Sequence, residues 1–350
     1  MTMSDAMTNF SPASGSNGME ATVKQTVIHS VGVVIATVGR QEVVEQTIRS
    51  LATRKSIPAI VIVAGADQND LPGSLPETPF QVQLLIAPTR GSAIQRNFGI
   101  QNLPASIEFV AFLDDDMEVH DDYCAEIENV FRSTPDVAGF SGCIMANGNI
   151  DRARARQMLD GYQVPSGMPA FGFYPGRWPG FYGCAMNVRR RWLNVEQFDE
   201  RLPLYAIGED CELGFRLSRH GSVGGSARCP VVHLAARVGR ISEVGVGFAQ
   251  IINYLYFANK GVGFPKLTTY FEKLIRLPLV NLFFCLFPFL DEKNSVDRKG
   301  RFHGNLLALR DVLRGEIEPM NLVQIKQNLD KQKTLRNIDN KKEKVDTVRK

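Results

Sequence analysis

Hydrophobic and polar positions follow two alternating patterns in the first third of the chain. Continuous apolar, β-branched runs predict buried strands at Val31–Thr37, Ala59–Ala64, Val82–Ala87 and Phe109–Leu113. Between these runs, apolar residues at helical spacing predict the helices Glu42–Leu51 and Ser92–Gln101. Strands separated by helices predict an α/β fold with a mostly parallel central sheet and helices on both of its faces.

The pattern becomes less regular after residue 120. It predicts helices over Asp122–Arg132 and Asp210–His220, and strands over Val137–Met145, Ala185–Val188 and Val231–Leu234. A loop rich in Gly, Pro and aromatic residues fills Gly161–Gly183. From Phe248 onward the chain is helical in pattern and strongly apolar. We therefore expect a helical extension behind the sheet domain.

The most apolar stretch is Leu274–Leu290, which is interrupted by Arg276, Pro278, Asn281 and Pro288. A helix that spans a bilayer needs about 20 predominantly apolar residues. The stretch is too short and too broken for that, so we predict that it does not span. Burial in a core, contact with a membrane surface and a re-entrant piece remain as interpretations.

Composition and charge narrow the class of protein. With 44% hydrophobic and 22% charged residues, the chain has ordinary globular composition. Residues 321–350 hold nine Lys or Arg and four Asp or Glu, a net charge of +5. This is more than the net charge of +3 for the whole chain. The basic excess thus sits in a tail, which is either a solvated end or a segment attracted to an anionic membrane. A near-neutral body argues against a nucleic-acid partner, and six scattered cysteines indicate a reducing, cytosolic location.

Asp114, Asp115 and Asp116 follow directly after the strand Phe109–Leu113. The carboxyl ends of parallel strands are where such sheets bind ligands. Three adjacent carboxylates repel one another, and a divalent cation bound to a diphosphate relieves that repulsion with ligands that magnesium and manganese prefer. The alternative is a solvated acidic turn that continues toward Glu118, and the position at a strand end favours the metal site.

Charged residues also stand at two predicted helix starts. Asp210, preceded by Glu209, is either an N-terminal cap or a general base that removes a proton from a hydroxyl. Arg90 and Arg96 flank the start of the helix at Ser92, where backbone N–H groups and guanidinium groups suit a phosphate or a polar base. The alternative for these arginines is an ordinary surface position.

Three further side chains have a structural and a functional interpretation. His233, near the end of a predicted strand, is either a structural residue or a contact for a metal or phosphate. Trp178 and Tyr182, in the Gly- and Pro-rich loop, either stack on a sugar ring or pack in the ordinary way.

Taken together, these segments resemble the family 2 glycosyltransferases of the GT-A fold. The matching segments, in order, are VVIATVGR, TRGSAIQRNFG, FLDDDMEVHDDY, GCAMNVRR, QFDE and GEDCELGFRL. They run from about Val31 to Leu234. The order of several motifs is more specific than any one of them. The resemblance implies an inverting transfer of a sugar from a nucleotide-diphosphate donor, UDP or dTDP in first place, to the hydroxyl of a sugar or lipid-linked saccharide acceptor.

The resemblance also implies roles for individual residues. Asp210 is the expected catalytic base, with Glu209 positioning it or the acceptor. The aspartates hold Mg²⁺ or Mn²⁺ against the donor diphosphate, with Asp114 and Asp116 as ligands and His233 as a further ligand. The expected donor site consists of Thr37, Asp67, Arg90, Arg96, Asp114 and Asp115. The expected acceptor site consists of Trp178, Tyr182 and Gly183.

The chain departs from the family at one position. An acidic pair usually follows the second strand and binds the base, and here Ala64 and Gly65 stand in its place. Either Asp67 replaces it, or the backbone and Arg90 recognise the base. A non-catalytic sugar- or nucleotide-binding relative is therefore the main alternative. The chain lacks the phosphate loop of a nucleotidyltransferase and the GxGxxG motif of a dehydrogenase. It also lacks the last position of the serine-hydrolase elbow motif, so these three classes are poorly supported.

We divide the chain accordingly. Residues 1–26 are expected to be disordered, 27–120 to bind the nucleotide sugar and 121–245 to bind the acceptor and carry the base. Residues 246–320 form the helical extension and 321–350 the basic tail. The extension resembles that of bacterial members which act on lipid-linked acceptors in cell-surface polysaccharide or glycolipid synthesis. We therefore expect a cytoplasmic protein, peripheral on the inner face of the cytoplasmic membrane.

Overall fold

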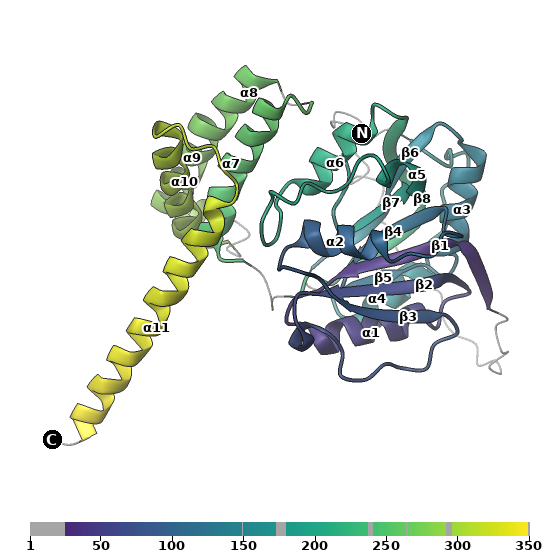
Figure 1. Ribbon diagram of the computed structural model, residues 1–350, viewed down its shortest axis with the longest axis horizontal. Coiled ribbons are helices and arrows are strands. Elements are labelled where there is room, and N and C mark those ends of the chain that lie inside the picture. Colours follow the sequence, from purple (N-terminus) through teal and green to yellow (C-terminus); the bar gives the residue numbers. More distant parts are fainter. Residues whose placement is uncertain are drawn as a thin grey trace.

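The computed structural model describes residues 25–148, 150–172, 180–236, 241–263, 265–291 and 296–348. An α/β domain built around one sheet is followed by a cluster of helices, and the last helix runs away from both (Figure 1). Most of the predicted N-terminal disordered segment, 1–26, lies outside the described residues.

The sheet has eight strands, and its two halves differ in direction. In spatial order the strands are β3 (Gln81–Ile86), β2 (Ser56–Gly65), β1 (Thr26–Ala36), β4 (Phe109–Asp114), β7 (Ala185–Arg189), β6 (Val137–Asn147), β8 (Ser222–His233) and β5 (Met117–Val119). The first four are parallel, as are β6 and β8, whereas β7 and β5 run antiparallel to their neighbours. The predicted parallel sheet is thus confirmed for the first half, and the second half is mixed.

Helices cover both faces of the sheet, as predicted. They are α1 (Gln41–Leu51), α2 (Ser92–Gln101), α3 (Tyr123–Ser133), α4 (Arg152–Asp160), α5 (Arg190–Leu193) and α6 (Glu209–Leu217). One core contains Ile48 of α1 and Ile127 of α3, and the other contains Ile100 of α2 and Leu213 of α6. Alternate side chains of β1 enter the two cores, which explains its continuous apolar sequence.

Helix α4 is an element that the hydrophobic pattern did not predict. Only Ala155 and Leu159 of its nine residues are buried, so the sequence shows almost no apolar stripe. The helix begins at a clear cap, because the Asp151 side chain accepts a hydrogen bond from the backbone N–H of Arg154. The sequence signal that could have predicted this helix is its N-terminal cap residue, Asp151, rather than hydrophobic periodicity.

In its described residues the C-terminal extension consists of four α-helices, a π-helical segment and the short 3-10 helix Pro288–Leu290. The bounds are α7 (Glu243–Lys260), α8 (Lys266–Phe271), the π-helix Glu272–Arg276, α9 (Leu277–Leu286) and α10 (Arg298–Leu313). Helix α7 joins the extension to the α/β domain, because its Phe257 is fully buried in the second core of the sheet domain. The Asn253 side chain also donates to the backbone carbonyl of Ile207, 2.9 Å away. The basic tail forms α11 (Asn321–Val348).

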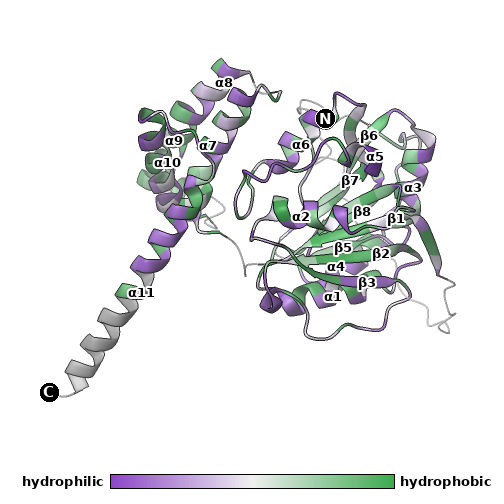
Figure 2. Ribbon diagram, in the orientation of Figure 1, coloured by the Kyte–Doolittle hydropathy of each residue, from purple (hydrophilic) through white to green (hydrophobic). Residues whose placement is uncertain are grey.

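The apolar stretch Leu274–Leu290 is not a buried core segment. In α9 only Pro278 and Asn281 are buried, while Leu279 is 58% and Leu286 64% exposed. Figure 2 shows the hydrophobic colouring of this part of the extension. Among the described helices, none is both long and apolar enough to cross a membrane. The stretch therefore packs against the core of the extension at Leu274 and Leu277 and exposes many of its other apolar side chains.

Helices α7 and α10 cross closely because each has a glycine at the contact. A Cβ added at Gly304 would lie 2.0 Å from the carbonyl oxygen of Val244, and one at Gly247 would lie 2.1 Å from that of Arg301. The Asn305 side chain donates to the Gly247 carbonyl at 2.7 Å, which fixes the register of the crossing. The extension therefore depends on two small residues.

We expect Gly304→Ala to lower the free energy of unfolding by about 1–3 kcal/mol, the usual cost of overpacking. Urea denaturation followed by circular dichroism measures this change. Gly73→Ala is the control, because a Cβ there meets no atom within 4 Å. Equal stability of the two variants would show that the helices separate without cost.

Candidate active site

A cavity of about 380 Å³ opens at the carboxyl ends of the parallel strands. Strands β1 and β4 pair so that Ala36 lies beside Asp114, which brings Thr37 next to the aspartate triplet. Helices α2 and α6 supply Arg96, Glu209 and Asp210 to the opposite wall. Residues that lie more than 100 positions apart therefore meet in one place.

Asp115 points into the protein and is held from two sides. The Thr37 hydroxyl donates to its Oδ2 at 2.7 Å, and Nη1 of Arg40 lies 2.6 Å from its Oδ1. Burial raises the pKa of Asp115 to about 6, although Arg40 and Thr37 act in the opposite direction. The predicted donor-binding residues Thr37 and Asp115 are thus bonded to each other in the cavity wall.

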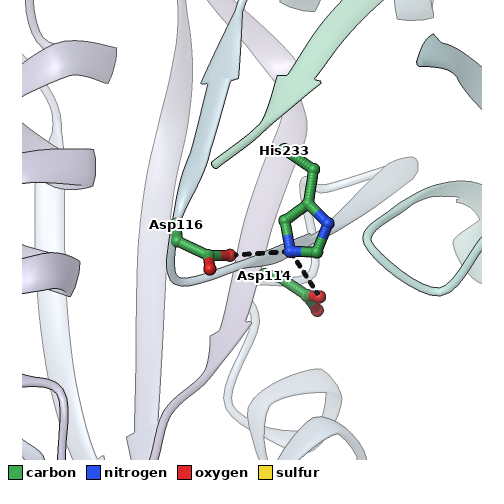
Figure 3. A group of neighbouring side chains, drawn as sticks. All are labelled: Asp114, Asp116 and His233. Atoms are coloured by element: carbon green, nitrogen blue, oxygen red, sulfur yellow. Dashed lines mark ion pairs between the residues drawn. The ribbon is translucent and has the colours of Figure 1, made fainter. Parts of the chain in front are cut away.

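Asp114, Asp116 and His233 form a group whose ligand atoms all lie within 4.8 Å of one another (Figure 3). Nε2 of His233 lies 3.1 Å from Oδ1 of Asp116 and 3.8 Å from Oδ2 of Asp114. The antiparallel pairing of β5 with β8 places His233 opposite Met117, beside the triplet. The structure therefore brings together the three predicted metal ligands.

These three residues fit a divalent cation. Nδ1 of His233 lies 2.8 Å from Oδ1 of Asn147, which can only accept, so this contact assigns a proton to Nδ1. Nε2 of His233 faces the buried Oδ1 of Asp116 at 3.1 Å, and a protonated Nε2 would donate to this oxygen. A neutral Nε2 would instead offer its lone pair to a cation that the Asp116 carboxylate also binds. Oxygen and imidazole ligands suit Mn²⁺, and Mg²⁺ is bound mainly through the carboxylates.

Arg96 connects the aspartates to helix α6. This buried guanidinium is paired with Glu209 through Nη1 and with Asp114 through Nη2, the latter at 3.1 Å. Burial works against its charge, but the two carboxylates outweigh burial and raise the pKa of Arg96. Burial raises the pKa of Glu209 to about 7 while Arg96 acts against this rise, and the Ser92 hydroxyl donates to Oε1 of Glu209 at 2.7 Å. Arg96 is thus an internal counter-ion rather than a surface residue.

Asp210 is not the N-terminal cap of its helix. Gly208 occupies that position in a left-handed conformation, with φ of 88°. The Asp210 carboxylate instead accepts hydrogen bonds at 2.9 Å from the backbone N–H groups of Gly183 and Cys211. Burial raises the pKa of Asp210. A fixed, half-buried carboxylate that faces a cavity and has a raised pKa has the properties of a general base.

The remaining predicted residues lie around this centre. Arg90 lines the cavity and pairs with Asp67 at 3.1 Å, whereas Asp67 itself is not among the described residues that line it. Tyr182 and Gly183 line the cavity beside Asp210, and Trp178 lies outside the described residues.

The missing acidic pair after β2 has a steric explanation at one position. A Cβ added at Gly65 would lie 2.9 Å from the Cβ of Asp70, so this strand end has no room for a side chain. Asp70 is buried and accepts a hydrogen bond from the backbone N–H of Gly39 at 2.7 Å, which ties the β2 end to the β1 end.

Sequence reasoning missed Arg40, Asn147 and Lys326 as residues of the site. Arg40 follows the first strand, and its position at a strand end was a usable signal. Asn147 ends β6 two residues beyond the predicted boundary, and Lys326 lines the cavity from α11, far along the chain. For Lys326 no local pattern signals the contact, because only the tertiary fold brings the tail helix to the cavity.

Comparison with known protein families finds a match for residues 32–194, from β1 through α5. The matching family is described as Glycosyl transferase family 2. No curated protein matches the chain.

Similar solved structures are distant in sequence. The mannosyltransferase PcManGT from Pyrobaculum calidifontis, in complex with GDP-Man and Mn²⁺, is 13% identical, with a TM-score of 0.47 over 81% of this chain and 87% of its own. TarS 1–349 from S. aureus is 13% identical, with a TM-score of 0.42 over 69% of this chain and 68% of its own. Both TM-scores are below 0.5, so these likenesses carry no argument about this chain.

We expect Arg96→Met to lower the free energy of unfolding by about 3–5 kcal/mol at pH 8, because it leaves the buried Glu209 carboxylate without its counter-ion. The loss should be smaller at pH 5, where Glu209, whose pKa is already raised, binds a proton and loses its charge. Urea denaturation at both pH values measures the difference. Arg49→Met, which removes an exposed pair with Glu45, should cost no more than about 1 kcal/mol. Equal losses in the two variants would contradict the internal counter-ion.

Proposed function

We propose that this chain is a glycosyltransferase of the GT-A fold, because residues 32–194 match the model of Glycosyl transferase family 2. It transfers a sugar from a nucleotide diphosphate to an acceptor hydroxyl with inversion at the anomeric carbon. One observation carries the proposal. The Asp210 carboxylate faces the same cavity as Asp114 and His233, so a base and a cation-binding group meet across one space. A single displacement needs both, one on each side of the reacting carbon.

The donor diphosphate lies beside Asp114 and Asp116. Asp114, Asp116 and His233 would hold Mg²⁺ or Mn²⁺, which neutralises the charge of the leaving diphosphate when bound. Both carboxylate oxygens of Asp115 are already bound, one by Thr37 and the other by Arg40, so Asp115 is not a ligand of the cation. Its role is therefore to keep the β1 and β4 ends together. Arg90 is the candidate contact for the base, and a UDP- or dTDP-sugar is the proposed donor.

Asp210 removes the proton from the acceptor hydroxyl. Two backbone N–H groups fix its orientation, and burial raises its pKa, which makes its carboxylate a stronger base. Glu209 acts as a positioning residue. It holds Arg96, and Nη2 of Arg96 lies 3.3 Å from the carbonyl oxygen of Gly183, whose N–H in turn binds Asp210.

The acceptor lies beside Tyr182 and Gly183, and Trp178 of the preceding segment is a further candidate for stacking on a sugar ring. A sugar or lipid-linked saccharide is the proposed acceptor, in the assembly of a bacterial cell-surface polysaccharide or glycolipid. The features that favour a lipid-linked acceptor are the exposed apolar residues of α8 and α9 and the basic composition of α11. We propose that these helices hold the protein peripherally on the cytoplasmic face of the membrane.

Asp210→Asn tests the chemistry. The amide keeps the shape of the side chain but cannot accept a proton, so turnover should fall at least about 100-fold, the lower range for a lost general base. Binding of the donor nucleotide, measured by calorimetry with UDP, dTDP and GDP in the presence of Mn²⁺, should stay within about twofold of wild type. Unchanged turnover would exclude Asp210 as the base. Failure of all three nucleotides to bind the wild-type protein, with and without Mn²⁺, would overturn the proposed transferase.

Leu279→Gln combined with Phe283→Gln tests the membrane contact, since both side chains are exposed on α9. We expect the double variant to co-sediment with phosphatidylglycerol vesicles at least about tenfold less than wild type, because burial of each apolar side chain contributes about 1.5–3 kcal/mol. Leu313→Gln is the control, because it removes an apolar side chain that is 89% exposed on α10. Equal sedimentation of all three proteins would show that α9 does not contact the bilayer.

A further inference from the structure

A second cavity, of about 570 Å³, lies between the α/β domain and helix α8. Asp210 and Tyr182 line both this cavity and the one at the strand ends. Helices α7 and α8 and the π-helix supply much of the remaining wall, including Tyr254, Thr269 and Lys273, and the α/β domain adds Gly180, Phe181 and Cys211. A molecule in the second cavity therefore reaches Asp210 without occupying the space beside the aspartate triplet.

Lys273 brings a positive charge to this cavity, whose lining also includes the carboxyl groups of Asp210 and Glu272. Its Nζ lies 4.1 Å from the ring centroid of Tyr254, and no carboxylate of the described residues forms an ion pair with it. The neighbouring Glu272 is paired with Arg276 instead. Burial lowers the pKa of Lys273, which is the direction expected for a partly desolvated ammonium group. Such a group gains most from an anionic ligand.

The face of the helix beside the cavity is apolar. Leu267, Phe271 and Ile275 recur every four residues and are 85%, 59% and 48% exposed. The cavity residues Thr268 and Glu272 each follow one position later, so the apolar stripe and the cavity wall are adjacent faces of one helical segment. An apolar chain can leave the cavity along this stripe.

We propose that the second cavity is the acceptor subsite, and that Lys273 selects an acceptor in which an anionic group, a phosphate or carboxylate, is joined to an apolar chain. This inference rests on the proposed function, because Asp210 acts on an acceptor only if the chain transfers a sugar to a hydroxyl. The acceptor hydroxyl lies at Asp210, the anionic group at Lys273 and the apolar chain along Leu267, Phe271 and Ile275. Lys273 thereby determines specificity without taking part in the proton transfer.

Calorimetric titration with three probes tests the inference. Octyl phosphate carries both features, octanol lacks the anion and inorganic phosphate lacks the apolar chain. We expect octyl phosphate to bind the wild-type protein at least about tenfold tighter than either of the others, the effect of one charge-assisted contact. Equal affinity for octanol would overturn the role of the charge. Equal affinity for inorganic phosphate would overturn the role of the apolar stripe.

Two substitutions assign the effect to Lys273. Lys273→Met should weaken octyl phosphate binding about tenfold and leave octanol unchanged, whereas Lys273→Arg should keep the affinity. Lys266→Met, an exposed lysine of the same helix outside the cavity wall, should bind as wild type. Equal octyl phosphate affinity in Lys273→Met and wild type would overturn the inference, as would loss of affinity in Lys266→Met to the same extent.

Nucleotide binding separates this inference from the proposed function. Every variant is also titrated with UDP, dTDP and GDP in the presence of Mn²⁺, which reports on the donor site and on folding. Intact nucleotide binding together with no preference for octyl phosphate overturns the acceptor subsite alone. Absence of nucleotide binding in the wild-type protein overturns the transferase itself.

Discussion

Repulsion among three consecutive carboxylates is the constraint on which the site depends. The fold gives each aspartate a different partner: Arg96 for Asp114, Arg40 and Thr37 for Asp115, and His233 for Asp116. These partners come from four separate elements or their ends, so the site forms only when both halves of the sheet are assembled. Asp114 and Asp116 both face His233, and the proposed cation site lies among these three side chains.

Arg96 extends this electrostatic arrangement to the acceptor side. It contacts Asp114, Glu209 and the Gly183 carbonyl, so a single guanidinium touches the metal group, helix α6 and the loop that orients Asp210. A buried arginine with two carboxylates is costly to desolvate and depends on both partners. The same residue therefore fixes the position of Asp210, the proposed base, and that of Asp114 in the proposed cation site.

Sequence reasoning predicted the elements that carry strong patterns and the residues that stand at their ends. The four buried strands of the first half, the helix Ser92–Gln101 and the group of Asp114, Asp116 and His233 were predictable from apolar runs and strand-end chemistry. Helix α4 was not, because it buries only two side chains. The antiparallel β7 and the contribution of Lys326 were also beyond prediction, since strand direction and contacts across more than 80 residues depend on tertiary packing rather than on local periodicity.

The wall shared by the two cavities has an evolutionary consequence. Asp210 and Tyr182 belong to the α/β domain, whereas much of the second cavity is formed by helices that follow it in sequence. Mutations in α8 and the π-helix can therefore reshape the second cavity, the proposed acceptor subsite, while leaving the aspartate triplet and its counter-ions untouched. A lineage built on this plan can diversify the molecules it accepts by exchanging a C-terminal appendage, with its catalytic machinery inherited unchanged.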